Sequence, residues 1–283
     1  MAKFLIIPTV AWKSYSALDA HTSIGSIYNA MNSPKDDYCQ ANATDPDTLD
    51  FTHSAALTFP LSVASCPAAF WTKWSDDILT DASANNYYLR LQTGASLGAL
   101  STKTLVTVYG DATASTNDVS INGGMTKTDG YSHVIGVFDD QYSSVCWRIQ
   151  LLNYGTPSVL EVKLYEVIIG HKVSLPDGTV REERAIQRVH YGGRVGVKKF
   201  GDANWSGIYG QNPRKSFELV MEGLNETQRN TFRDVFRYCR GTYPVLVVED
   251  SSDKTTWTKC KMVRRTEEED AKMFTVAIEF DEI

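Results

Sequence analysis

The chain has 283 residues, of which 42% are hydrophobic and 22% charged, and its formal net charge is −6. This composition is ordinary for a globular protein with buried cores, and the length exceeds that of a usual single domain, so we expect two domains. The acidic balance, together with the lack of a basic face interleaved with aromatic residues, argues against a nucleic-acid partner.

The chain begins with a short apolar run, Phe4–Ile7, which stops at Pro8. This run is too short for a secretory signal or a membrane span, so we expect a first β-strand and a protein made in the cytosol. The cysteines show no CxxC spacing and no paired Cys/His spacing. They stand at positions 39, 66, 146, 239 and 260. An odd number without such spacing predicts free thiols rather than a disulfide framework or a zinc site.

The next 160 or so residues are rich in Ser, Thr, Asn, Ala and Asp, with short alternating runs between turn-forming clusters. Runs of this kind predict strands over residues 57–59, 87–91, 104–109, 133–138, 147–152 and 160–169. No convincing helix of ten or more residues occurs here, so the pattern predicts an all-β sandwich or jelly roll. Val167–Ile169 is apolar on both faces, which predicts cover on both sides by the second domain or a neighbouring copy.

The alternating pattern of apolar and polar residues ends after Gly170. The stretch HKVSLPDGTVREER contains a Pro-Asp-Gly turn followed by charged residues, which is typical of a linker or a boundary hairpin. We therefore expect a β-sandwich domain over residues 1–172 and a second domain over residues 173–283.

The second domain is predicted to be an α+β unit. A half-buried strand over 217–222 precedes the clearest helix in the chain, residues 225–241, and strands over 243–248, 257–263 and 273–280 follow. Asn225 can cap the helix together with Gln228. One helix face carries the apolar residues Phe232, Val235, Phe236 and Cys239. The opposite face, with Arg229, Arg233, Asp234 and Arg237, is expected to be solvated or to form an interface, and Glu267–Asp270 is expected to be a polar turn.

The sequence predicts no catalytic residues and no enzyme. The sequence lacks HExxH, P-loop and correctly placed GxGxxG motifs, and no two histidines stand three or four residues apart. A pair of carboxylates for glycoside hydrolysis could only be brought together by the fold, which a single sequence does not show.

One acidic stretch is a candidate metal site. Asp45, Asp47 and Asp50 lie close together in the sequence DPDTLD, and oxygen ligands clustered on a loop are what Ca²⁺ prefers. The stretch lacks the glycine and the terminal glutamate of an EF-hand loop. A solvated turn without any cofactor is therefore the alternative interpretation.

Three aromatic residues are candidates for a saccharide-binding platform. Trp71, Trp74 and Tyr131 lie in the first domain, where flat aromatic faces could stack on a sugar. The alternative is that the two tryptophans, together with Phe70, pack inside the sandwich.

Two resemblances accompany these patterns. About half of the chain resembles the galactose-binding-like β-sandwich, a family that includes carbohydrate-binding modules. The resemblance lies in the stretches WTKWSDD, KTLVTVYG, CWRIQLLN and LEVKLYEVIIG. Roughly the last third of the chain resembles the distal-tail or tail-tip structural proteins of long-tailed bacteriophages. The resemblance lies in the stretch KSFELVMEGLNETQRNTFRDVFRYCRGTYPVLVVED and in the later FTVAIEFDEI. This second resemblance is one of general sequence pattern and not of a fixed motif, and it identifies no active-site residue.

Together the resemblances imply a virion structural protein, made and assembled in the host cytoplasm. The second domain would form a ring of three or six copies at the tail tip, joining the tail tube to hub or tip proteins. The sandwich would project outward and touch host surface saccharide. The alternative is a carbohydrate-binding or glycan-hydrolysing protein in which the sandwich binds the ligand.

Overall fold

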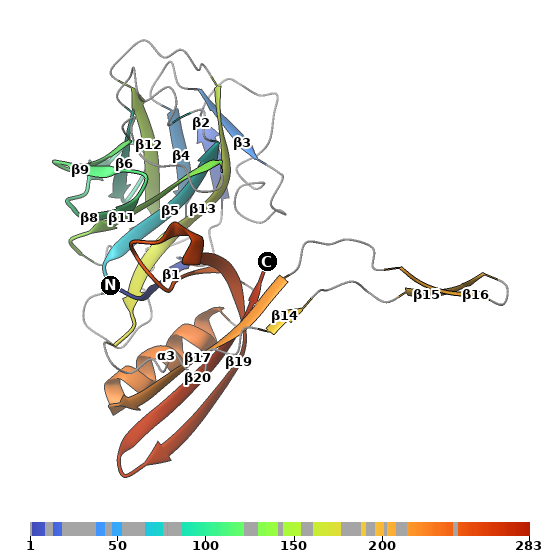
Figure 1. Ribbon diagram of the computed structural model, residues 1–283. Coiled ribbons are helices and arrows are strands. Elements are labelled where there is room, and N and C mark those ends of the chain that lie inside the picture. Colours follow the sequence, from blue (N-terminus) through green and yellow to red (C-terminus); the bar gives the residue numbers. More distant parts are fainter. Residues whose placement is uncertain are drawn as a thin grey trace.

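The structure is a computed structural model. It describes residues 2–8, 14–18, 38–42, 47–52, 66–75, 78, 87–121, 130–140, 144–153, 161–176, 188–190, 196–200, 203–207, 214–239 and 243–283. The fold is mostly β with one described α-helix lying on a sheet, which confirms the predicted fold class (Figure 1).

Most strands belong to two antiparallel sheets. The larger sheet has the order β14 (Arg188–His190), β17 (Arg214–Leu224), β20 (Met273–Glu282), β19 (Trp257–Asp270), β18 (Val245–Val248), β1 (Phe4–Pro8), β13 (Glu161–Ser174), β5 (Ala68–Ser75), β11 (Tyr131–Phe138) and β8 (Leu105–Gly110), with β3 (Cys39–Asn42) also paired to β13. The second sheet has the order β2 (Ser14–Leu18), β4 (Asp47–Thr52), β12 (Cys146–Asn153), β6 (Tyr87–Gly94), β10 (Asp118–Ile121) and β9 (Thr113–Ser115), with β7 (Leu100–Thr102) on β6. β15 (Gly196–Phe200) and β16 (Ala203–Gly207) form a separate two-stranded sheet.

The second sheet packs face to face against the β13–β5–β11 part of the larger sheet. Alternate residues of β12, including Trp147 and Ile149, share one buried core with Phe70 and Trp74 of β5. Inward-facing residues from two sheets that share a core define a sandwich, as the sequence predicted for this half. β5 itself was not among the predicted strands, because it is buried along nearly its whole length and its sequence does not alternate.

The first strand joins the sandwich to the helical half. β1 pairs with β13 on one side, from Phe4↔Ser174 to Pro8↔Gly170, and with β18 on the other. Its alternate side chains enter two different cores: Phe4 and Ile6 lie with Trp71, whereas Leu5 and Ile7 lie with the helix. One continuous sheet therefore runs through both halves of the chain.

The end of the closing strand β13 is covered on both faces, as its apolar sequence predicted. Val167 and Ile169 enter the sandwich core, and Ile168 packs with Leu246 and Trp257 of the C-terminal half. The cover on the second side thus comes from the same chain.

The C-terminal half confirms the predicted helix. Helix α3 (Glu226–Cys239) covers one face of β17, β20 and β19 (Figure 1). The Asn225 side chain accepts a hydrogen bond from the Gln228 backbone N–H at 2.9 Å, and the Gln228 side chain accepts one from the Asn225 N–H at 3.0 Å. This reciprocal pair is the expected capping box. Phe232, Val235 and Cys239 are buried beneath the helix.

One sequence prediction in this region was wrong. Glu267–Asp270 is not a turn but the end of β19, because the reversal occurs at Ala271 and Lys272, both with positive φ. A two-residue turn with positive φ at both positions matches the twist of a hairpin. The stretch after Gly170 is not a linker at its start, since β13 continues to Ser174 along β1. The expected boundary at residue 172 lies inside this strand, and independent folding of the two domains stays a prediction.

The predicted strand at 57–59 lies outside the described residues. None of the five cysteines forms a disulfide, as the spacing indicated, and all five are buried.

We expect the substitution Ile6→Ala in β1 to lower the free energy of unfolding by about 2–5 kcal/mol, because it leaves a cavity at the joint between the halves. Urea unfolding followed by circular dichroism measures this change. The control is Val106→Ala on β8, whose side chain is 58% exposed, with an expected effect within about 0.5 kcal/mol. Equal losses in the two variants would show that β1 is not a joint.

Candidate functional site

The two tryptophans expected to stack on a saccharide are covered in the structure. Trp74 is fully buried in the sandwich core, and Trp71 is 2% exposed on the other face of β5. The Trp71 ring stacks on His133 at 6.2 Å between ring centroids. These positions agree with the alternative of core packing, because neither indole offers a flat face to solvent.

Tyr131, the third aromatic candidate, is half-buried on the outer face of the sandwich. Its ring lies edge-on to Tyr165 at 5.0 Å, and the Lys73 ammonium lies 4.2 Å from its centroid. Tyr38 extends the group, with its ring 5.6 Å from that of Tyr165 and 4.9 Å from the Lys163 ammonium. The structure therefore brings together tyrosines and lysines from β11, β13 and β5, with Tyr38 just before β3, rather than the predicted set of three.

The acidic stretch expected to bind calcium is a strand from Asp47 onward, and Asp45 lies outside the described residues. Asp50 is 1% exposed and accepts two hydrogen bonds from Arg148 on the neighbouring strand, at 2.6 and 2.8 Å. This two-point contact neutralises the carboxylate inside the sheet. Within the described ranges, no group of three or more His, Cys, Asp or Glu side chains could hold a metal ion. Calcium binding by Asp45, Asp47 and Asp50 stays a prediction.

A polar recess of about 170 Å³ lies where the outer face of the sandwich meets the start of β19 and the end of β20. Its lining comprises Trp71, Lys73, His133, Glu166, Lys254, Thr255, Trp257, Thr258, Lys259, Glu282 and Ile283. The His133 ring lies between two tryptophans, stacked on Trp71 and edge-on to Trp257 at 6.3 Å. The recess therefore draws its walls from both halves of the chain.

Ion pairs fasten the two walls of the recess together. Glu166 of β13 lies 3.5 Å from Lys73 of β5 and 3.4 Å from Lys259 of β19. Lys254 reaches Asp111 at 2.5 Å, and the second oxygen of Asp111 accepts the His133 backbone N–H at 2.8 Å. Buried charges that are paired in this way resist separation, because breaking a pair leaves an uncompensated charge away from water. We assign this network a structural role.

Burial lowers the pKa of Lys259, an effect that the charge and hydrogen bond of Glu166 oppose. Sequence reasoning missed this group entirely. The one available signal was Glu166 itself, a single carboxylate within the otherwise apolar strand LYEVII.

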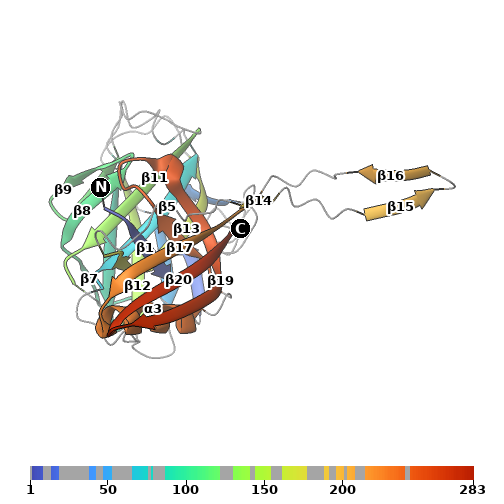
Figure 2. The same cartoon turned by 60° about the horizontal axis from the view of Figure 1, so that its bottom comes forward.

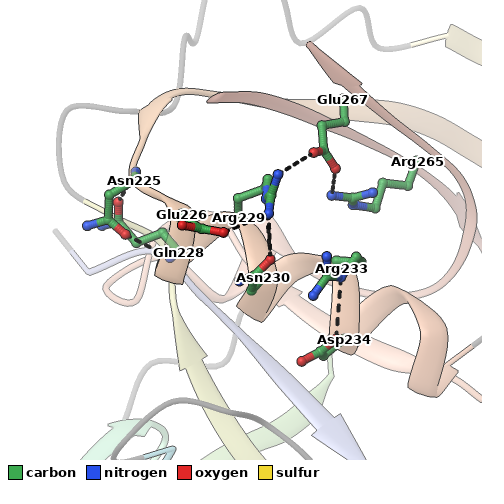
Figure 3. A network of polar contacts seen from close by, with 9 residues as sticks. All are labelled: Asn225, Glu226, Gln228, Arg229, Asn230, Arg233, Asp234, Arg265 and Glu267. Carbon is green, nitrogen blue, oxygen red and sulfur yellow. Dashed lines mark hydrogen bonds and ion pairs between the residues drawn. The ribbon is translucent and has the colours of Figure 1, made fainter. Parts of the chain in front are cut away.

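A second polar network links helix α3 to the β19–β20 hairpin (Figure 3). Arg229 contacts Glu267 at 3.3 Å and Glu226 at 3.4 Å, and Arg265 also pairs with Glu267. The Arg229 guanidinium lies 4.3 Å from the centre of the Phe274 ring. Part of the helix face that was expected to be solvated or interfacial thus holds the hairpin in place.

The β15–β16 hairpin lies away from the body of the molecule in both views (Figures 1 and 2). It connects β14 to β17, and in the described structure its strands pair only with each other. We call this hairpin, residues 196–207, the arm.

The described part of the chain contains no helix with the length and apolar character needed to cross a membrane.

Comparison with known proteins gives little. No protein-family model matches the chain, and no curated protein matches it. Among solved structures, "CBM32 of AlyQ in complex with 4,5-unsaturated mannuronic acid" is 13% identical and matches over 60% of this chain and 99% of that one, with a TM-score of 0.35. "Truncated AlyQ with CBM32 and alginate lyase domains" is 9% identical over 89% of this chain and 56% of that one, with a TM-score of 0.38. At these scores the likeness carries no argument about function.

We expect Asp50→Ala to lower the free energy of unfolding by roughly 3 kcal/mol, because it leaves the Arg148 guanidinium within the sheet without its carboxylate partner. Chemical denaturation measures the loss. Asp118→Ala, which breaks the more exposed pair with Arg90, is the matched control and should cost less. If Ca²⁺ raises the Tm of the wild type but not that of Asp50→Ala, Asp50 is a calcium ligand and not merely the partner of Arg148.

Lys259 makes stability depend on pH. Between its lowered native pKa and the ordinary value of 10.5, the unfolded chain binds more protons at this site than the native chain, so the site's contribution to stability rises with pH. We expect the free energy of unfolding of the wild type minus that of Lys259→Met to increase as the pH rises toward the ordinary pKa of 10.5. Lys261→Met, an exposed neighbour on the same strand, is the control. A flat or falling difference would contradict this assignment.

Proposed function

We propose that the chain is a self-assembling structural subunit of the tail tip of a long-tailed phage, with the C-terminal half as the assembling unit. The arm is the observation that carries this proposal. An isolated two-stranded hairpin is marginally stable in water. In the described structure, β15 and β16 pair only with each other, so the outer edge of each strand is open to a further partner. Contact with another chain would supply both the burial and the missing strand partner.

The composition of the arm supports a partner of this kind. Its sequence includes Phe200 and Trp205, and aromatic residues of these types are enriched at protein interfaces. The resemblance of the last third of the chain to distal-tail proteins points in the same direction. A ring of three or six copies would then join the tail tube to hub or tip proteins, and the sandwich would decorate that ring.

A saccharide-binding role for the sandwich is the second candidate. The observation that favours it is the group of half-buried tyrosines and lysines around Tyr131, because aromatic rings beside ammonium groups suit a polar ligand with a flat face. A glycan array separates the two candidates. Binding that Tyr131→Ala abolishes, by a chain that stays monomeric, would favour saccharide recognition over assembly.

We expect the purified chain to form a closed ring with the mass of three or six copies, and deletion of residues 196–207 to return it to a monomer. Light scattering after size-exclusion chromatography gives the mass, and negative-stain microscopy gives the shape. Because the described strands of the arm pair with no strand of the body, the deletion variant should keep the circular dichroism spectrum and Tm of the body. A wild-type chain that remains monomeric at high concentration would overturn the proposal.

A further inference from the structure

The arm and an open stretch of strand lie at opposite edges of the C-terminal sheet. In the order β14–β17–β20–β19, the arm is inserted between β14 and β17 at one side, and β19 stands at the other (Figure 1). β18 pairs with β19 only from Trp257 to Cys260. From Lys261 to Asp270, β20 is the only described strand that pairs with β19.

The sequence explains why β18 leaves this stretch open. Pro244 stands directly before the first residue of β18, and proline has no N–H to donate to a neighbouring strand. The ladder therefore ends, while β19 continues for ten more residues. Val263 is 51% exposed at a shift in the register between β19 and β20.

The open stretch ends in acidic residues. Glu267 is held by Arg229 and Arg265, whereas Glu268, Glu269 and Asp270 are exposed, and no hydrogen bond or ion pair of their side chains is recorded in the described structure. Charges and a register shift protect a sheet edge against indiscriminate pairing. A strand that pairs here must bring positive charge with it.

We propose that the arm of a second copy of this chain docks on the open stretch of β19. β15 has the sequence GVKKF, so it carries Lys198 and Lys199, and its five residues match the length of 266–270. Backbone hydrogen bonds would extend the sheet by one strand, and the lysines would meet the carboxylates of Glu268 to Asp270. This inference rests on the proposed assembly function and names the contact that performs it.

The positions of the arm and of the open stretch of β19 allow a head-to-tail arrangement of copies. Donor and acceptor are different surfaces on opposite edges, so each copy can give its arm to one neighbour and receive the arm of another, which is a heterologous contact. A heterologous contact closes into a ring when the rotation between copies divides a full turn evenly. A reciprocal exchange of arms between two copies would also satisfy both surfaces, and the mass of the assembly distinguishes such a dimer from a ring.

Charge reversal tests the contact in the full-length chain. We expect Lys198→Glu/Lys199→Glu and, separately, Glu268→Lys/Glu269→Lys to raise the dissociation constant of the assembly at least about tenfold at low salt. The variant with all four changes should recover assembly, because the charges are again complementary. Asp139→Lys/Asp140→Lys, an equal charge change on the sandwich, should leave the mass unchanged. The Tm of each variant confirms that it folds.

The outcomes separate this inference from the function on which it rests. A monomeric wild type would overturn both. A ring that neither double variant weakens would overturn the docking site alone, and so would failure of the fourfold variant to recover. Hydrogen exchange supplies a second readout: backbone amides within 264–270 should gain protection in the assembled wild type and lose it when the arm is deleted.

Discussion

The pairing of β1 with two different strands is the interaction on which the rest of the structure depends. A five-residue strand receives β13 on one side and β18 on the other, so two halves that would otherwise meet only through side chains share one sheet. The residues from Phe4 to Ile7 enter two cores in alternation, and each is fully or almost fully buried. Because a slip by one residue would move every side chain to the wrong face, the alternation of Phe4 and Ile6 with Leu5 and Ile7 fixes how the halves are joined.

The polar recess follows from this joint. Once β18 is placed beside β1, the start of β19 comes to lie over the outer face of β5 and β11, where Trp257 meets His133. The charged groups that line the contact neutralise one another across it, with Glu166 between lysines from each half. Separating the two halves without rehydrating these groups would leave uncompensated buried charges, which is costly. The sandwich is therefore held firmly to the unit that is proposed to assemble.

Helix α3 is held to the β19–β20 hairpin by apolar burial and by ion pairs together. The apolar stripe of the helix supplies burial, and Arg229 fixes the hairpin that extends beyond the sheet. A long hairpin held in this way can present one open edge without fraying. The arm leaves from the other side of the same sheet, which makes the C-terminal half two-sided in the manner that head-to-tail assembly requires.

The sequence by itself determined the elements whose signals are local. The capping box at Asn225 and Gln228, the apolar stripe of the helix and the alternating strands of the sandwich all depend on neighbours a few residues away. Cover on both faces of Val167–Ile169 was also predicted, because exposure of either face would have been costly.

The sequence did not predict the pairing between distant residues. Only the tertiary structure placed Phe4 between Ser174 and Val248, buried Trp71 against His133, paired Asp50 with Arg148, and brought Lys73, Glu166 and Lys259 together. Such contacts depend on which strands become neighbours, and strand order is decided by the packing of whole sheets rather than by any local pattern.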